Sequence, residues 1–253
     1  MFTVHVDRDR VNELRLALLP MATLCDTADI KCTKQRLSVI VVPSRYPFVA
    51  ALRMLPEFFT SFQFHPVAGN FNAYRANFYL KLFITNISNM YSDDLSVTLY
   101  LNKHNALAPV KFEDPYTGYL QYSALLLTNS HRIDISPIDL SVFFAIRSAE
   151  FINLLSDLVV LPTEYACVVV KKTEVVFKSL RNEIVLSTKK NDFIMGGIPQ
   201  EDKVFFLISP SPIYFFYHIA YTSKFVWFFK TVSSLSLMSC CMDLYASYVV
   251  SFT

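Results

Sequence analysis

The side chains with the clearest chemical potential in this sequence are cations that fall on the solvent faces of predicted helices. They are Arg8, Arg10, Arg15, Lys81, Arg147, Lys224 and Lys230. Lys and Arg side chains can neutralise nucleic-acid phosphates, which follow one another about every 1.7 Å along a duplex axis. The formal net charge is only +2, so such contacts would be few and blind to base sequence. Each cation could equally lie on an ordinary solvated helix face.

Residue patterns for catalysis or cofactor binding are missing. The chain contains four glycines, and they do not cluster into a loop that could cradle a phosphate. The five histidines are scattered, and we expect His218, inside an apolar run, to be a core histidine. We therefore expect a protein that is not an enzyme and that carries no metal and no cofactor.

Composition favours a β-rich protein in a reducing compartment. Hydrophobic residues make up 53% of the 253 positions, and Val, Ile, Phe and Tyr, which suit pleated surfaces, dominate them. The odd number of cysteines, five, and the lack of metal-site spacing predict buried free thiols, as in cytosol or nucleus. We expect no membrane span, because prolines, His218, Lys224 and Lys230 interrupt the longest apolar region, 204–232.

Periodicity indicates that the chain consists of two similar halves. A strand at Phe2–Val6 precedes a helix at Arg10–Leu19, which Asp7 or Asp9 caps and Pro20 stops. A shift of 140 positions gives a strand at Val142–Ile146 and a helix capped by Ser148. The apolar stripes of the two helices then match: Val11, Leu14 and Leu18 in the first, Phe151, Leu154 and Leu158 in the second.

The remaining elements follow the same order in both halves. The first half continues with strands Met21–Ile30, Arg36–Val42, Phe48–Leu55 and Tyr74–Tyr79, helix Leu80–Met90 and strand Leu95–Leu101. The second continues with strands Tyr165–Val170, Glu174–Leu180, Ile184–Lys189 and Ile213–Ile219, helix Tyr221–Thr231 and strands Leu235–Cys241 and Tyr245–Phe252. In this alignment Lys81 and Lys224 occupy equivalent places. We predict an α+β fold with domains at 1–130 and 140–253, joined by a connector at 131–139.

Two βαβββ–βαββ halves with one connector resemble a subunit of a ring-shaped DNA sliding clamp. The sequence further resembles the Rad-nine-type subunit of the nine-one-one DNA-damage checkpoint clamp. The segments that carry this resemblance are Leu37–Arg45, Leu55–Phe59, Tyr165–Ser179, Ile219–Phe229 and Leu235–Leu237.

The resemblance implies a DNA clamp fold in which helices line a central channel and sheets form the outer wall. It implies a nuclear protein that joins two other clamp subunits in a heterotrimeric ring around double-stranded DNA. A clamp loader would place the ring, and checkpoint and repair proteins would bind to it. The seven cations named above would face the DNA.

Two further groups of residues follow from the resemblance. Ring closure requires sheet edges that pair between subunits, and the candidates are Leu120–Leu127 and Ile184–Lys189, with apolar residues Leu120, Leu126, Ile184 and Leu186. Partner peptides would bind an apolar groove beneath the connector, where the matching positions are Val42, Tyr46, Ile133 and Ile135. Internal strands and core packing explain these residues equally well.

Two alternative functions remain open. A homotrimeric replication clamp would share the same architecture. A β-rich protein-interaction module without DNA binding would share the composition but would not assemble with clamp subunits.

Overall fold

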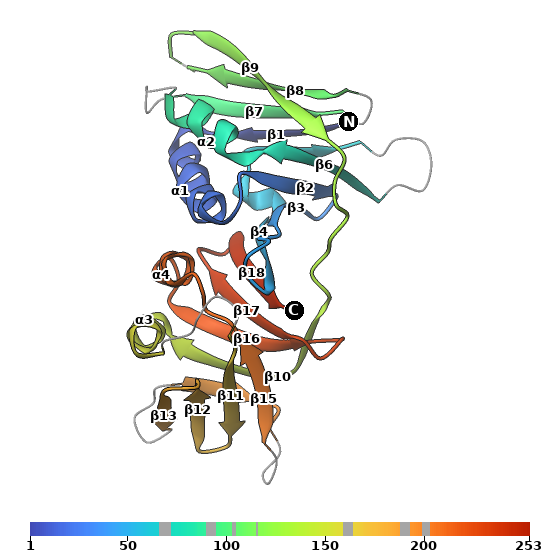
Figure 1. The fold of residues 1–253 in the computed structure, drawn as a ribbon. Coiled ribbons are helices and arrows are strands. Elements are labelled where there is room, and N and C mark those ends of the chain that lie inside the picture. The colour runs from blue at the N-terminus through green and yellow to red at the C-terminus, as the bar shows by residue number, and fades with distance from the viewer. Residues whose placement is uncertain are drawn as a thin grey trace. The chain divides into compact units, whose positions relative to one another are not determined.

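The computed structural model describes residues 1–65, 72–89, 95–102, 105–114, 116–158, 164–187, 193–198 and 203–253. The chain forms two compact units (Figure 1). Unit 1 comprises Met1–Val41 and Ala51–Ile133, and unit 2 comprises Val42–Ala50 and Asp134–Thr253. The segment Val42–Ala50 thus belongs to unit 2, whereas the sequence analysis assigned it to the first domain. The physical reason is that Phe48 packs on Phe215, Phe216 and Phe252.

Unit 1 contains two helices and antiparallel strands. Its elements are β1 (Phe2–Val6), α1 (Arg8–Leu24), β2 (Thr27–Thr33), β3 (Arg36–Val41), β4 (Phe48–Met54, whose first residues belong to unit 2), the short 3-10 helix η1 (Pro56–Phe58), β5 (Ser61–Phe64), β6 (Ala73–Tyr79), α2 (Leu80–Asn89), β7 (Ser96–Leu101), β8 (Leu107–Glu113) and β9 (Leu120–Thr128). The helices α1 and α2 lie side by side (Figure 1).

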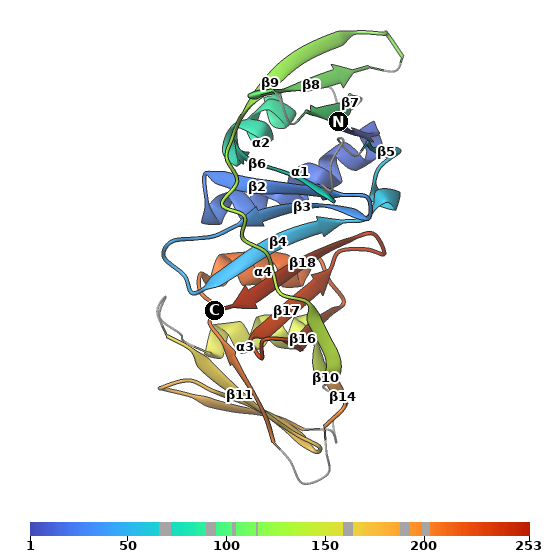
Figure 2. The ribbon, with the colours of Figure 1, turned by 90° about the vertical axis from the view of Figure 1, so that its right-hand side faces the viewer.

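Unit 2 is built in the same way. Its elements are β10 (Ile138–Arg147), α3 (Ser148–Asp157), β11 (Ala166–Lys171), β12 (Glu174–Lys178), β13 (Glu183–Ser187), β14 (Phe193–Gly196), β15 (Val204–Ile208), α4 (Ile213–Tyr221), β16 (Phe225–Thr231), β17 (Ser236–Cys241) and β18 (Ala246–Phe252). The strands β10, β16, β17 and β18 are neighbours in one sheet (Figure 2). A second sheet has the order β13-β12-β11-β15.

The two units share most of their strand pairing as well as their element order, although among the described strands the β6–β9 pair of unit 1 has no β15–β18 counterpart in unit 2. In unit 1, β1 pairs with β5 and β7, β7 with β8, β8 with β9, and β2 with β3 and β6. In unit 2, β10 pairs with β14 and β16, β16 with β17, β17 with β18, and β11 with β12 and β15. All these pairs are antiparallel, so the α+β class holds and β10–β18 correspond one by one to β1–β9.

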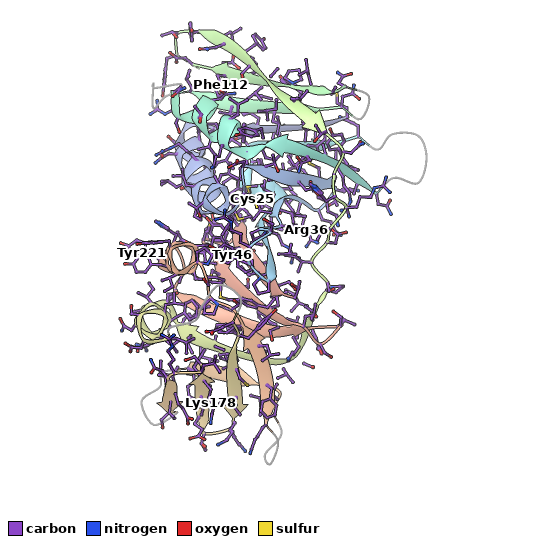
Figure 3. The ribbon with its side chains drawn as sticks, in the orientation of Figure 1. Cys25, Arg36, Tyr46, Phe112, Lys178 and Tyr221 are labelled. Atoms are coloured by element: carbon purple, nitrogen blue, oxygen red, sulfur yellow. The ribbon has the colours of Figure 1, made fainter. Side chains whose placement is uncertain are left out.

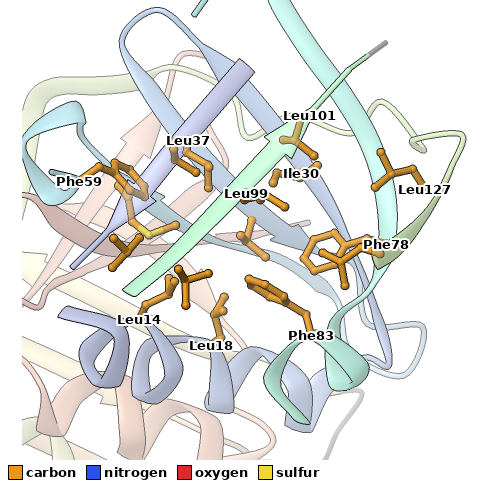
Figure 4. Close-up of a pocket in the computed structure, with 16 residues that line it drawn as sticks. Leu14, Leu18, Ile30, Leu37, Phe59, Phe78, Phe83, Leu99, Leu101 and Leu127 are labelled. Atoms are coloured by element: carbon orange, nitrogen blue, oxygen red, sulfur yellow. The ribbon is translucent and has the colours of Figure 1, made fainter. Parts of the chain in front are cut away.

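Each unit has its own apolar core. In unit 2, the rings of Phe144 and Phe228 stack with centroids 4.5 Å apart, and neither side chain is exposed. The core of unit 1 encloses a cavity of about 30 Å³ lined by apolar residues such as Leu18, Phe78 and Leu99 (Figure 4). A bound water needs two to four polar partners, which this apolar lining does not offer, so the cavity is a dry gap in the packing.

The first helix is longer than predicted. The prediction that Pro20 ends it was wrong, because α1 continues through Pro20 to Leu24. Met21 is fully buried and Ala22 is 9% exposed, so burial of the added turn offsets the hydrogen bond that proline removes. The strand predicted at Met21–Ile30 therefore begins only at Thr27, while Phe2–Val6 is confirmed as a strand.

The prediction for residues 213–231 had helix and strand reversed. Ile213–Tyr221 is helix α4, and Phe225–Thr231 is strand β16. Short apolar aromatic runs do not distinguish the two structures by periodicity alone. The strand lies between β10 and β17, and this pairing decides its conformation. His218 is consequently an exposed residue of α4 rather than a core histidine.

Smaller differences concern single residues and segment ends. Arg147, not Ser148, is the N-cap of α3, and the Ser148 hydroxyl is buried without a hydrogen-bond partner. The predicted end of one helix at Met90, and the predicted end of the strand Ile184–Lys189, lie outside the described residues. None of the helices in the described ranges has the length and apolar run that a membrane crossing requires.

Candidate functional site

Among the described strands, β9 is paired on one side only along most of its length. Residues Leu120–Leu126 pair with β8 on one side. On the other side, β6 contacts only the end of the strand, at Leu127 and Thr128. Leu120, Tyr122 and Leu126 are 46%, 64% and 60% exposed. The two predicted residues Leu120 and Leu126 thus lie on an apolar edge whose backbone groups have room for another strand.

Strand β13 is the edge of the second sheet in unit 2. It pairs with β12 alone among the described strands, with Ile184 opposite Phe177 and Leu186 opposite Val175. Ile184 and Leu186 are half-buried, and the residue between them, Val185, is 52% exposed. Over Glu183–Leu186, this edge therefore presents apolar side chains and pairs on one side only among the described strands.

In the internal repeat, these two edges correspond to two strands that meet in unit 2. In the repeat, β9 corresponds to β18 and β13 corresponds to β4. Within unit 2, the end of β18 contacts the start of β4. The Thr253 N–H donates to the Pro47 carbonyl oxygen over 3.0 Å, and the rings of Phe48 and Phe252 are 6.3 Å apart. In the described part of the chain this contact therefore occurs once, whereas Leu120–Leu126 of β9 and Glu183–Leu186 of β13 each pair with a single strand.

The predicted cations of unit 1 are engaged in local contacts. Arg10 donates to the carbonyl oxygens of Glu57 and Phe58 and so ties α1 to η1. Arg15 donates to the Asn12 side chain, and Arg8 pairs with Asp9 and lies over the Tyr116 ring.

Lys81 also has a partner. Its ammonium lies 2.5 Å from Asp26, and the hydrogen bond and charge of that carboxylate raise the pKa of Lys81. The four predicted cations of unit 1 therefore all make contacts with groups of the protein itself.

In unit 2 the structure brings together two of the predicted cations, Arg147 and Lys224. Arg147 ends β10 opposite Phe225, the residue after Lys224. The Ser148 N–H donates to the Lys224 carbonyl oxygen over 3.2 Å. Both cations are exposed at the start of α3, where the helix dipole also favours an anion.

Lys230 lies elsewhere and serves a structural role. It is on strand β16, not on a helix as predicted, and its ammonium lies over the Phe206 ring at 5.0 Å and donates to the Ser234 carbonyl oxygen. Burial lowers the pKa of Lys230. The predicted equivalence of Lys81 and Lys224 was wrong, since Lys81 is inside α2 and Lys224 follows α4.

The four predicted groove residues are divided between the two units. Val42, Tyr46 and Ile135 belong to unit 2, and Ile133 belongs to unit 1. Tyr46, labelled in Figure 3, stacks on the buried Phe48 ring with centroids 5.9 Å apart. None of the four lines the cavity in the unit 1 core.

A buried carboxylate that the sequence analysis did not identify holds the start of the connector. Asp29 is 5% exposed. It accepts hydrogen bonds from Ser130 Oγ (2.7 Å), the His131 backbone N–H (2.9 Å) and Asn77 Nδ2 (2.8 Å). His131 Nδ1 lies 3.3 Å away, and Arg132 has a left-handed backbone with φ 58°. The signal in the sequence was an aspartate between Ala28 and Ile30 in a predicted strand.

The described residues contain no group of three or more His, Cys, Asp and Glu side chains arranged to hold a metal ion. Cys32 and Cys240 are buried, and burial raises the pKa of both thiols, but Cys241 is exposed, contrary to the prediction of buried cysteines.

A scan against models of protein families and a search of curated proteins found no match for this chain.

Proposed function

We propose that this chain is a non-enzymatic subunit of a heterotrimeric checkpoint sliding clamp that encircles double-stranded DNA. The observation that carries the proposal is the repeat of strand pairing: the end of β18 contacts the start of β4 within unit 2, while Leu120–Leu126 of β9 and Glu183–Leu186 of β13 pair on one side only among the described strands. Proteins usually cover or charge such edges, because an open apolar edge attracts another strand. Both of these edges carry exposed apolar side chains, so each could accept a strand of another subunit.

The pairing pattern favours head-to-tail assembly. If β9 of one subunit pairs with β13 of the next, each subunit uses two different surfaces, which is a heterologous contact that can close into a ring. The new pair would reproduce the β18–β4 arrangement, so each junction would have the same geometry as one the chain already forms. The resemblance noted above supplies the number of subunits, three, and the identity of the other two as clamp subunits.

The contribution of this subunit to DNA binding is small in this proposal. Arg147 and Lys224 offer the one predicted pair of exposed, adjacent cations in the described residues. A few such contacts hold a duplex without reading its sequence. The other two subunits supply further cations, and a clamp loader places the nuclear ring on DNA, where checkpoint and repair proteins bind.

One observation favours a second candidate, a protein-interaction module that does not bind DNA. The helices α3 and α4 contain no Lys or Arg between Ser148 and Asp157 or between Ile213 and Tyr221. A duplex-facing surface normally carries such residues. A module of this kind would not assemble with clamp subunits, and this difference separates the two functions.

The experiment is to mix the chain with two candidate clamp subunits and measure native mass. We expect one complex with one copy of each chain. The variant Leu126→Lys, on the β9 edge, should weaken assembly at least tenfold, whereas Leu16→Lys, an equally polar change at a leucine 50% exposed on α1, should not. A trimer of this chain alone would indicate the replication clamp, and a monomer that ignores both partners would exclude both clamp functions.

A further inference from the structure

Helix α4 exposes a stripe of three tyrosines on the side opposite its buried face. Tyr214, Tyr217 and Tyr221, here called the tyrosine stripe, are 80%, 43% and 74% exposed. Their spacing of three and four residues places them on one helix face. In Figure 3 the Tyr221 side chain lies on the side of α4 that points away from the sheet.

The opposite face of α4 accounts for the stability of the helix. Phe215, Phe216, Ile219 and Ala220 are completely buried. The tyrosine stripe therefore adds exposed aromatic surface that folding of unit 2 does not require. Clustered exposed aromatic groups usually mark a binding surface.

Two rings of the stripe lie nearly parallel to each other and are partly exposed. Tyr217 and Tyr221 are nearly parallel, with an interplanar angle of 10° and centroids 6.3 Å apart. Flat ligands stack on such rings, and nucleic-acid bases of every type present a suitable face.

The charges near the stripe suit a polyanion at one end. Helix α4 itself contains no charged Lys, Arg, Asp or Glu. Lys224 follows Tyr221 by three residues, and the bond from Ser148 N–H to Lys224 O brings Arg147 to the same place. Of the neighbouring carboxylates on α3, Glu150 is half-buried and Asp157 lies at the far end of that helix from Arg147.

We propose that the tyrosine stripe stacks the unpaired bases of single-stranded DNA, while Arg147 and Lys224 contact its phosphates. The rings would be of little use to a duplex, because its bases are paired and stacked inside and only its phosphates meet the protein. The inference rests on the proposed clamp function for the choice of DNA as the ligand, and it adds a preference for an unpaired strand.

The test uses the isolated chain, so that it does not depend on ring assembly. Fluorescence anisotropy at low salt measures the affinity for a labelled oligothymidylate and for a duplex of equal length. We expect tighter binding of the single strand. Tyr214→Ala and Tyr221→Ala should each weaken single-strand binding by about tenfold, in line with the loss of one base stack, and should leave duplex binding unchanged.

Matched controls separate stacking from folding and from charge. Tyr214→Phe and Tyr221→Phe keep the ring and should retain affinity within about twofold. Tyr119→Ala, at a tyrosine 57% exposed outside α4, should have no effect. Lys224→Ala should weaken single-strand and duplex binding alike and lower the salt dependence by about one phosphate contact.

Three results would overturn the inference. The first is that the alanine variants bind single-stranded DNA as tightly as the native chain. The second is that the alanine variants lose as much affinity for duplex as for single-stranded DNA. The third is that the phenylalanine variants lose as much single-strand affinity as the alanine variants. If the alanine variants instead prevent assembly with clamp subunits and leave DNA binding intact, the stripe is a protein interface. If the chain binds single-stranded DNA through the stripe but does not assemble with clamp subunits, the clamp proposal is contradicted. The proposal that the stripe binds single-stranded DNA would still hold.

Discussion

The hydroxyl of Ser130 donates a 2.7 Å hydrogen bond to Oδ2 of Asp29, a residue 101 positions earlier in the chain. Asp29 sits on β2, and Ser130 is the second residue after β9 ends. The same carboxylate accepts from the His131 backbone N–H and from Asn77. Asp29 therefore fixes where the connector leaves unit 1 and in which direction it starts.

Removal of this carboxylate should loosen the connector. In Asp29→Ala, the partner groups lose their acceptor in a buried setting, which should lower the free energy of unfolding of unit 1 by about 1–3 kcal/mol. Limited trypsin digestion should cut after Arg132 several times faster than in the native chain. Asp157→Ala, at an exposed carboxylate in unit 2, is the control and should change neither quantity. Unchanged cleavage in Asp29→Ala would show that other contacts hold the connector.

Truncation within the aromatic core of unit 2 should be strongly destabilising. Phe228 is fully buried against Phe144, so Phe228→Ala removes a stacked pair and leaves a cavity that should cost about 3–5 kcal/mol. Urea unfolding followed by circular dichroism measures this loss. Phe205→Ala, at a phenylalanine 53% exposed, should change stability by less than about 0.5 kcal/mol. Equal effects of the two changes would contradict the position of β16 in the core.

Charge reversal should distinguish the cation pair of unit 2 from Lys81. In the assembled ring, Arg147→Glu with Lys224→Glu should shorten retention on circular DNA, because two adjacent exposed phosphate contacts become repulsive. Lys81→Glu should have a smaller effect, because Asp26 already engages the Lys81 ammonium. Retention time measured on a closed plasmid provides the comparison. A larger effect of Lys81→Glu would show that unit 1 provides the main contact.

The cysteines should differ in reactivity. Burial raises the pKa of the Cys32, Cys240 and Cys241 thiols and so lowers their thiolate fractions, but Cys32 and Cys240 are also buried away from a reagent that can reach Cys241. At pH 8 in the native protein, we expect iodoacetamide to label exposed Cys241 before either buried thiol, as measured by peptide mass mapping. Denaturation should equalise the rates. Rapid native labelling of Cys240 would contradict its burial in β17.

The sequence predicted those elements whose apolar periodicity is long or alternating. Phe2–Val6, Arg36–Val41 and Ser96–Leu101 appear as strands within a residue or two of the predicted bounds. The edge candidates were identified as strands, but only the pairing shows that Leu120–Leu126 and Glu183–Leu186 pair on one side only among the described strands.

Other features depend on tertiary contacts that a single sequence does not reveal. The run Ile213–Tyr221 is apolar or aromatic at every position except His218, so its pattern fits a strand as well as a helix, and the packing of Phe215 and Phe216 fixes it as a helix. Because helix and strand are exchanged relative to the prediction, Lys224 lies between α4 and β16 rather than in a helix. The same exchange places the three tyrosines of the stripe on one helix face. The role of Asp29 was equally hidden, because its donors Ser130 and His131 are about a hundred residues away.

The central claim is that β9 and β13 pair with neighbouring subunits, and amide hydrogen exchange tests it most directly. Exchange of Leu120–Leu126 and Glu183–Ser187 is measured by mass spectrometry in the free chain and after mixing with the two clamp subunits. Both edges should exchange at least tenfold more slowly in the complex, because interstrand hydrogen bonds protect amides, while β16, already paired on both sides, should not change. A complex that forms without protection of either edge would contradict the claim.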